Sequence, residues 1–462
     1  MKDIDFYRDD INEELKGVIT IDNEDYAAEL KIKKFQIEVR FFDSNNKMER
    51  DYSSLLKLES AVFCSGGMFF RLFGMELSGT SFRLIGQANS FNDYKFTAEG
   101  LLFSRVNLNC INEYQTLGFY SKGTDAWLGN TSKLNEIIND GFMGKVPDQE
   151  SLVEFERALK NVGVVGAYYS YKYGGLGTIY TVGMSVAPHI TLRFDHSVDL
   201  NGLIDKYIDL YMLMRFLTGD RLNFTSVYVH LKSGFNNEDV KFYLPEKNNT
   251  GSKLNNAMSL LYSSSYHDDS EKKFPLHIFE NYFSDEDKEI NLLIKKFVNY
   301  SLIDSEEERF LGFYRILERV TFKQSFYVDE AELSALLDRA KGILQKKFEK
   351  LSVSKFKRAI IRANKSKEST ETCVRHYIKS MPEGFVNRMR LNEIKIDELC
   401  SVRNSMTHQP FFSVSEAKLH DCVITAKLLV SIILMSKLGV SYNLIEEVAN
   451  TKGWKYGLSY LT

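Results

Sequence analysis

The spacing of apolar residues changes once along this chain, and that change limits the fold more than any single motif does. Up to about residue 270, short runs rich in β-branched and aromatic residues, such as GVITIDN and FQIEVRFFD, alternate with turn signals. From about residue 285 onward, apolar residues recur every three or four positions, as they do along an amphipathic helix. A polar, turn-rich stretch over 244–275 separates the two patterns. We therefore expect an α+β multidomain protein, in which a β-rich N-terminal domain over 1–270, a sandwich or a curled sheet, precedes an all-α helical bundle over 280–462.

Length and composition describe a soluble protein with more than one core. A domain usually holds roughly 100–200 residues, and this sequence has 462, of which 44% are hydrophobic and 26% charged. The most apolar run, 428–435, lies between Lys427 and Lys437 and is far shorter than the ~20 residues that span a bilayer, so we expect a buried helix and no membrane partner. The acidic N-terminus lacks the pattern of a secretion signal, and five cysteines without a CxxC pair fit reduced thiols, which together favour the cytoplasm.

The back half predicts a series of helices, and the front half predicts two. In the front half we expect helices over 148–162 and 199–219, the second ending at Gly219 as its C-cap. The last helix of the chain begins at a capping box, in which Ser413 is followed three residues later by Glu416. The other helices expected in the back half lie over 289–303, 305–322, 329–351, 354–365 and the residues that lead into 397–412.

Glycine-rich and histidine-containing stretches form no recognisable cofactor or metal site. In YGGLGTIY, Tyr180 stands where a dinucleotide-binding loop needs its third glycine, and no helix pattern follows. The acidic HDDSE at 267–271 lies in the polar stretch, where a solvated loop is the simpler interpretation. The histidines of the front half show neither HExxH nor HxH spacing; they are His189, His196, His230, His267 and His277. We therefore expect no metal and no cofactor.

A strongly basic segment over 341–367 stands out in a chain whose net charge is −3. Four of its cations fall at i, i+3, i+7 and i+10, so that on one helix they form a single stripe: Lys355, Arg358, Arg362 and Lys365. Three apolar residues fall largely on the opposite side: Phe356, Ile360 and Ile361. A stripe of this kind can follow a nucleic-acid backbone, although a merely solvated helix face is the alternative.

The motif VRNSMTH carries the candidate chemistry. On a helix, Asn404 and His408 are four residues apart and share a face, while Arg403 is rotated away from His408. Pro410 disfavours the α conformation at the residue before it, so the helix should end at about His408. An imidazole at a helix C-terminus is favoured in its protonated form. The helix itself is anchored by three apolar residues that should be buried: Leu399, Val402 and Met406.

These residues resemble a known family. Arg403 and Asn404, followed after three residues by His408, resemble the R-x(4–6)-H signature of the HEPN (higher eukaryote and prokaryote nucleotide-binding) superfamily. The upstream segment RFLGFYRILERV resembles the first helix common in that group. With a β-rich front domain that ends in ITLRFDHSVDLNGLIDKYIDLYMLMRFLTG, the whole chain is similar to the ApeA-like anti-phage HEPN proteins, which act in abortive infection.

The resemblance implies a metal-independent endoribonuclease that acts as a symmetric homodimer, with two copies of the motif facing each other. His408 would move the proton, Arg403 would stabilise the charged transition state, and Asn404 would orient His408 or hold the RNA. Arg315 and Glu318 are weaker supporting candidates. The RNA would be tRNA or another host RNA, contacted by the cationic stripe, and the N-terminal domain would sense a phage protein or restrain the nuclease.

Two other interpretations remain open at the level of sequence. Many HEPN-like domains bind a nucleotide or a partner without catalysis, so the chain could be a non-catalytic scaffold. A purely structural two-domain protein, in which Arg403 only caps carbonyl groups at a helix end, would leave Arg403 and His408 unexplained as a pair.

Overall fold

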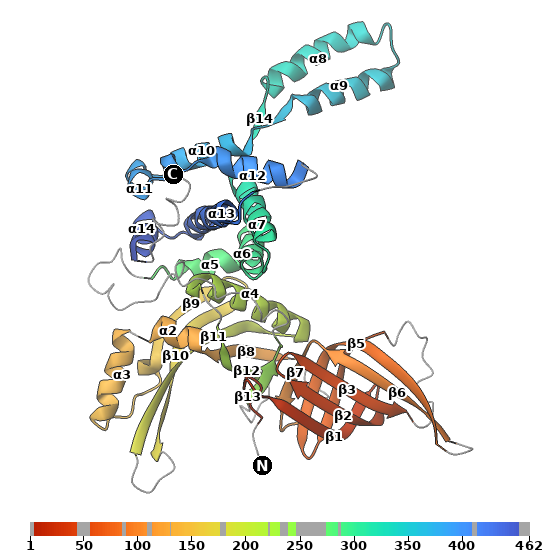
Figure 1. The fold of residues 1–462 in the computed structure, drawn as a ribbon, viewed down its shortest axis with the longest axis vertical. Helices are drawn as coiled ribbons and strands as arrows, with labels where there is room; N and C mark the ends of the chain where they lie inside the picture. The colour runs from red at the N-terminus through yellow and green to blue at the C-terminus, as the bar shows by residue number, and fades with distance from the viewer. Residues whose placement is uncertain are drawn as a thin grey trace. The chain divides into compact units, whose positions relative to one another are not determined.

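The computed structural model describes residues 4–43, 56–85, 89–108, 113–129, 131–175, 182–219, 222–231, 239–245, 274–284, 288–408 and 414–451. The chain divides into two compact units, Met1–Lys295 and Lys296–Thr462 (Figure 1). The first is β-rich and the second helical, which confirms the expected α+β architecture. Helix α5 (His277–Phe283), which follows the polar stretch, falls in the first unit.

Six antiparallel strands at the start of the first unit close on each other. Their order is β4-β1-β2-β3-β6-β5, and β4 pairs back onto β5 from Lys57↔Glu76 to Ser65↔Met68, so the ring has no free edge. Alternate side chains point inward and form the core, among them Leu30, Ile32, Val39, Phe41 and Phe96, all of which are fully buried. The strands are β1 (Asn12–Ile21), β2 (Glu24–Lys33), β3 (Gln36–Asp43), β4 (Lys57–Ser65), β5 (Met68–Ile85) and β6 (Asn89–Ala98).

The same sheet continues beyond this ring as an open, curved sheet. Strand β5 has 18 residues and pairs with β4, β6 and β7, so it belongs to both parts. From β5 the order runs β7-β13-β12-β8-β11-β10-β9, which makes one sheet of 13 strands in the described part of the chain. These strands are β7 (Gly100–Ser104), β8 (Tyr114–Ser121), β9 (Val153–Leu159), β10 (Gly163–Gly175), β11 (Val182–Val198), β12 (Phe224–Leu231) and β13 (Asp239–Tyr243).

The helices of the first unit differ in part from expectation. Helix α4 (Leu200–Thr218) packs on β8 and β11 and ends at Gly219, as predicted. The helix expected over 148–162 is wrong, because only a 3-10 turn, η1 (Glu150–Leu152), precedes strand β9. Pairing with β10 overrides the helical spacing there, since it buries Phe155 and Leu159 against the sheet. Three described helices of this unit have no expected counterpart: α2 (Lys122–Leu128), α3 (Ser132–Phe142) and α5.

The second unit is built around α13 (Glu416–Lys437), which is largely buried from Cys422 to Met435 and packs along α7 (Glu306–Thr321). Its N-cap is Ser415, whose hydroxyl accepts a hydrogen bond from the Lys418 amide at 3.4 Å. The expected cap, Ser413, lies outside the described residues. The other elements of this body are α6 (Lys288–Ser301), which begins in the first unit, α10 (Thr370–Ser380), α11 (Glu383–Met389), η5 (Leu391–Glu393), α12 (Ile396–His408) and α14 (Tyr442–Thr451).

Helix α13 is also the one described helix that is long and apolar enough to cross a bilayer. Its 22 residues make it longer than the apolar run that marks it in the sequence. However, 72% of its apolar window is buried inside the fold. That burial is typical of the core helix of a soluble protein.

A helical hairpin, which we call the arm, extends from the second unit (Figure 1). It consists of α8 (Glu330–Leu344) and α9 (Lys350–Asn364), joined to the body by the paired strands β14 (Gln324–Phe326) and β15 (Lys365–Lys367). The single helix expected over 329–351 is wrong, because the chain turns between Leu344 and Lys350. One long helix would have no partner for its narrow apolar face. The turn lets α8 and α9 contact each other along that face.

The predicted cationic stripe is divided between two elements of the arm. Lys355, Arg358 and Arg362 are exposed on α9, but Lys365 begins strand β15, so the four residues do not share one helix. The apolar side is not a buried face either, because Phe356 is 54% exposed.

The C-cap of α4 gives a test of the fold. Gly219 has a φ of 67°, in the left-handed region that penalises a β-carbon by about 1–2 kcal/mol. We expect Gly219→Ala to lower the free energy of unfolding of the β-rich unit by about 1 kcal/mol, and Gly219→Asn to lower it less, since Asn tolerates this conformation. Urea unfolding followed by circular dichroism measures both. Equal losses for Ala and Asn would contradict the assigned cap.

Candidate functional site

Helix α12 positions the motif as a helix anchored by two buried side chains. Leu399 and Val402 are 0% and 3% exposed, while Met406 is only half-buried. The helix runs to His408, two residues before Pro410 in the sequence, where the proline predicts its end. The His408 side chain and Pro410 lie outside the described residues, so the structure describes only the backbone position of that histidine.

Arg403 lies on α12 among side chains from α7. Its guanidinium carbon is 5.7 Å from the centre of the Tyr314 ring, and Nη2 is 3.7 Å from Oε1 of Glu318. Nη1 donates a hydrogen bond to Oδ1 of Asn404 at 3.0 Å. The Arg403 side chain is 30% exposed, so part of the guanidinium still reaches solvent. The guanidinium of Arg403 is therefore held in one orientation by an aromatic face, a carboxylate and an amide.

Two further hydrogen bonds fix the groups that hold Arg403. Thr370, in the first turn of α10, donates from its hydroxyl to Oε1 of Glu318 at 2.9 Å. Tyr314 donates to the Cys400 sulfur at 3.2 Å, which ties α7 to α12 one turn before Arg403. Three helices, α7, α10 and α12, thus meet at one polar cluster of the helical unit.

The pKa shifts in this cluster follow from burial. Burial raises the pKa of the Tyr314 hydroxyl, so this group stays protonated and donates. Burial also raises the pKa of the Cys400 thiol, and the carboxylates of Glu371, Asp397 and Glu318 raise it further. The hydrogen bond from Tyr314 acts in the opposite direction, because it favours the thiolate. Cys400 is therefore a structural thiol and not an activated nucleophile.

The predicted site residues fall into two groups. Arg403, Asn404 and Glu318 are brought together, whereas Arg315 is exposed on α7 and makes no contact with Arg403 among the residues that the structure describes. The three cations on α9 belong to the arm, and the side chain of Lys365 lies outside the described residues.

Sequence reasoning named Asn404 and Glu318, but it did not anticipate Tyr314, Cys400 and Thr370. Tyr314 lies one turn before Glu318 on α7, and Cys400 one turn before Arg403 and Asn404 on α12. Spacings of three and four residues place these side chains on one face of each helix, which is the signal that could have found Tyr314 and Cys400. Thr370 had no such signal, because it reaches Glu318 across 52 residues of sequence.

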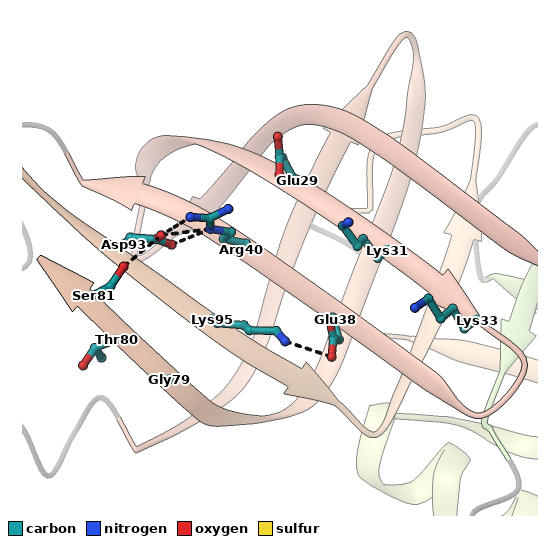
Figure 2. A pocket seen from close by; sticks show the side chains of 10 residues that line it. All are labelled: Glu29, Lys31, Lys33, Glu38, Arg40, Gly79, Thr80, Ser81, Asp93 and Lys95. Atoms are coloured by element: carbon teal, nitrogen blue, oxygen red, sulfur yellow. Dashed lines mark hydrogen bonds and ion pairs between the residues drawn. The ribbon is translucent and has the colours of Figure 1, made fainter. Parts of the chain in front are cut away.

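A hollow of about 420 Å³ lies on the outer face of β2, β3, β5 and β6 (Figure 2). Its charges pair across neighbouring strands. Nε of Arg40 lies 2.8 Å from Oδ1 of the buried Asp93, and Nζ of Lys95 lies 3.1 Å from Oε1 of Glu38. Cross-strand pairs of this kind stabilise a sheet. We therefore interpret the hollow as a ladder of ion pairs and not as a reaction site.

His189 serves packing. Its ring on β11 lies 4.7 Å from that of Tyr120, 5.8 Å from that of Tyr168 and 6.1 Å from that of Tyr228, measured between ring centres. Burial lowers the pKa of His189 to about 4, so the imidazole is neutral at physiological pH. Among the described residues, no three His, Cys, Asp or Glu side chains gather as a metal site requires.

Comparison with known proteins leaves the site to be judged from its own geometry. No family model matches the chain, and no curated protein or solved structure matches it. The functional interpretation rests on the motif, the cluster around Arg403 and the fold of the helical unit.

The Cys400 thiol gives a test of the cluster. A cysteine ordinarily has a pKa of about 8.5, so the rate of alkylation by iodoacetamide should rise only at a higher pH in the folded protein. We expect Tyr314→Phe to move that rise to still higher pH, because it removes the hydrogen bond that favours the thiolate. Mass spectrometry of the Cys400 peptide measures the profile, with Tyr442→Phe as the control. A profile that rises at or below pH 8.5, or one that Tyr314→Phe leaves in place, would contradict the assigned contacts.

Proposed function

We propose that the helical unit is a metal-independent endoribonuclease of HEPN type, with Arg403 and His408 as its catalytic residues. The observation that carries the proposal is the position of Arg403, which is held partly exposed by Tyr314, Glu318 and Asn404 near the end of a helix whose last residue is His408. A fixed cation and an imidazole at a helix end are the two groups that cleavage of RNA without a metal requires.

The chemistry uses the ribose 2′-OH as nucleophile. It attacks the adjacent phosphorus, the P–O5′ bond breaks, and the products are a 2′,3′-cyclic phosphate and a 5′-OH. His408 transfers the proton, a contribution of typically ~10²–10⁴ in rate. Arg403 neutralises the charge that develops on the phosphate oxygens. DNA lacks the 2′-OH and should not be cut.

In the proposed site, Asn404 also has a positioning role toward Arg403. Its amide oxygen accepts a hydrogen bond from Arg403, so it orients the guanidinium fork. Glu318 acts in the same way from the other side, and Thr370 orients Glu318 in turn. These three are positioning residues in the proposed site.

The wider biological role rests on the resemblance alone. We propose a cytoplasmic anti-phage protein that acts as a homodimer, with two copies of the motif around one RNA phosphate. The substrate would be host RNA, including tRNA. The β-rich unit would restrain the nuclease or respond to a phage protein.

The ion pair between Arg403 and Glu318 favours a second candidate function. In this candidate function, Arg403 has a structural role alone: its ion pair with the carboxylate 3.7 Å away joins α12 to α7. The chain would then be a non-catalytic HEPN scaffold that binds a nucleotide or a partner.

The nuclease proposal is tested by mapping RNA ends in cells that express the protein with and without phage infection. Wild type should generate new ends that carry a 2′,3′-cyclic phosphate, and His408→Ala and Arg403→Ala should each reduce them by about 10²-fold or more. Matched controls are His420→Ala and Arg388→Ala, which remove an exposed histidine and another ion-paired arginine of the same unit.

Either of two results would contradict this assignment. If wild type leaves no such ends in any condition, the nuclease proposal fails. If cleavage persists in both site variants, the enzyme is a nuclease but its catalytic residues lie elsewhere.

Arg403→Lys separates the two candidate functions. Lysine keeps the charge and can pair with Glu318, but it lacks the planar fork that binds phosphate oxygens. The nuclease proposal therefore expects Arg403→Lys to lose most cleavage while the thermal midpoint of unfolding stays near that of wild type. Cleavage at the wild-type rate would assign Arg403 to the structural ion pair.

A further inference from the structure

The arm is the part of the helical unit with the least buried surface. None of the described side chains of α8 is buried, and on α9 only Val353 and Asn364 are. The two helices contact each other along one side, and the hairpin extends away from the rest of the helical unit (Figure 1). A helical hairpin that contributes almost nothing to a core needs another explanation for its length.

The outer face of α9 is cationic and unpaired. This helix has no acidic residue, and of its cations Lys357 is paired with Asp338 on α8 at 2.6 Å. In the part of the chain that the structure describes, Lys355, Arg358 and Arg362 are exposed and have no carboxylate partner. At 1.5 Å per residue, these three charges follow one line of about 10 Å along the helix. Such a line matches the repeated charges of a phosphate backbone.

The base of the arm is joined to the proposed site. The side chain of Asn364, which is 5% exposed, bonds to both the amide and the carbonyl of Val328 at 3.0 and 2.9 Å, and this fixes the two ends of the hairpin. Beyond β15 the chain enters α10, where Thr370 donates to Glu318, the partner of Arg403. The arm therefore starts within a few residues of the cluster that holds Arg403.

Two anionic partners have to be weighed, RNA and a lipid surface. Exposed apolar side chains at the turn, Phe348 at 60% and Leu351 at 65%, would suit a bilayer. Lys346, Lys347 and Lys350 near that turn are exposed as well. However, the line of Lys355, Arg358 and Arg362 runs along α9 away from the turn, toward the base of the arm and the proposed site. This placement favours RNA.

We propose that the α8–α9 arm holds a base-paired stem of RNA by its phosphates, so that a strand continuing from that stem enters the site at Arg403. The inference rests on the proposed function, because it names the substrate class of that same site: RNA with a duplex stem beside the cleaved position. A convex rod with one charged face suits the outside of a duplex, whereas proteins that bind single strands use grooves lined with stacked aromatic rings. Recognition of this kind reads charge and shape and not sequence.

The test measures binding of RNA to the full chain carrying His408→Ala, which keeps the RNA intact. One RNA is a labelled hairpin with a stem of about 16 base pairs, the span of a typical duplex-binding domain, and the other is unstructured and of equal length. Fluorescence anisotropy gives Kd for each between about 50 and 200 mM salt. We expect the hairpin to bind at least about tenfold more tightly than the unstructured RNA.

Neutralising the stripe should then remove the preference. In Lys355→Gln/Arg358→Gln/Arg362→Gln, the slope of log Kd against log salt should fall by about three, one for each lost phosphate contact. The matched control is Lys379→Gln/Lys395→Gln/Lys437→Gln, which removes the same charge from exposed positions of the helical unit outside the arm. All three stripe residues are exposed, so both variants should keep the wild-type thermal midpoint.

Three results would overturn the inference. They are equal binding of the stripe variant and the control, equal binding of the two RNAs by wild type, and arm-dependent binding to phosphatidylglycerol vesicles without any effect on RNA. Failure here differs from failure of the proposed function. If cyclic phosphate ends form equally in the stripe variant, only the arm inference fails; if no ends form while stripe-dependent hairpin binding persists, only the nuclease fails.

Discussion

The helical unit depends on the burial of α13. Between Cys422 and Met435 this helix carries buried apolar side chains on every side, so no single neighbour can cover it and it has to be enclosed by other helices. Helix α7 packs along it and also contacts α10, while α12 contacts both α10 and α13. Enclosing α13 therefore fixes α7 and α12 relative to each other. That arrangement is what brings Tyr314 and Glu318 to Cys400 and Arg403.

The polar cluster is thus a secondary result of apolar packing. Leu399 and Val402 hold α12 in place, and the next residues along the helix carry the charged groups. Arg403 is costly to immobilise because its side chain has many rotamers. Contacts with the Tyr314 ring, the Glu318 carboxylate and the Asn404 amide offset that loss of entropy and hold the guanidinium in one orientation.

The features that were predicted correctly from the sequence are those that a few neighbouring residues determine. The change of periodicity, the end of α4 at Gly219 and the end of α12 at His408 each depend on a few adjacent residues, and each was predicted. The errors at β9 and at the turn between α8 and α9 have a different origin: Phe155 and Leu159 fit a helix as well as a strand, and only pairing with β10 decides between them. Likewise Thr370 and Glu318 meet across 52 residues, so no local spacing could connect them.

The path of the chain through the large sheet has a consequence for its synthesis. Strand β13 pairs with β7 on one side and with β12 on the other, so it joins the closed ring to the open sheet. Yet Asp239–Tyr243 is also the last strand of that sheet, in chain order, among the residues that the structure describes. The sheet therefore cannot be completed until residue 243 has left the ribosome. At that moment no residue of α7 or α12 has been synthesised. The β-rich unit can be complete before Arg403 exists.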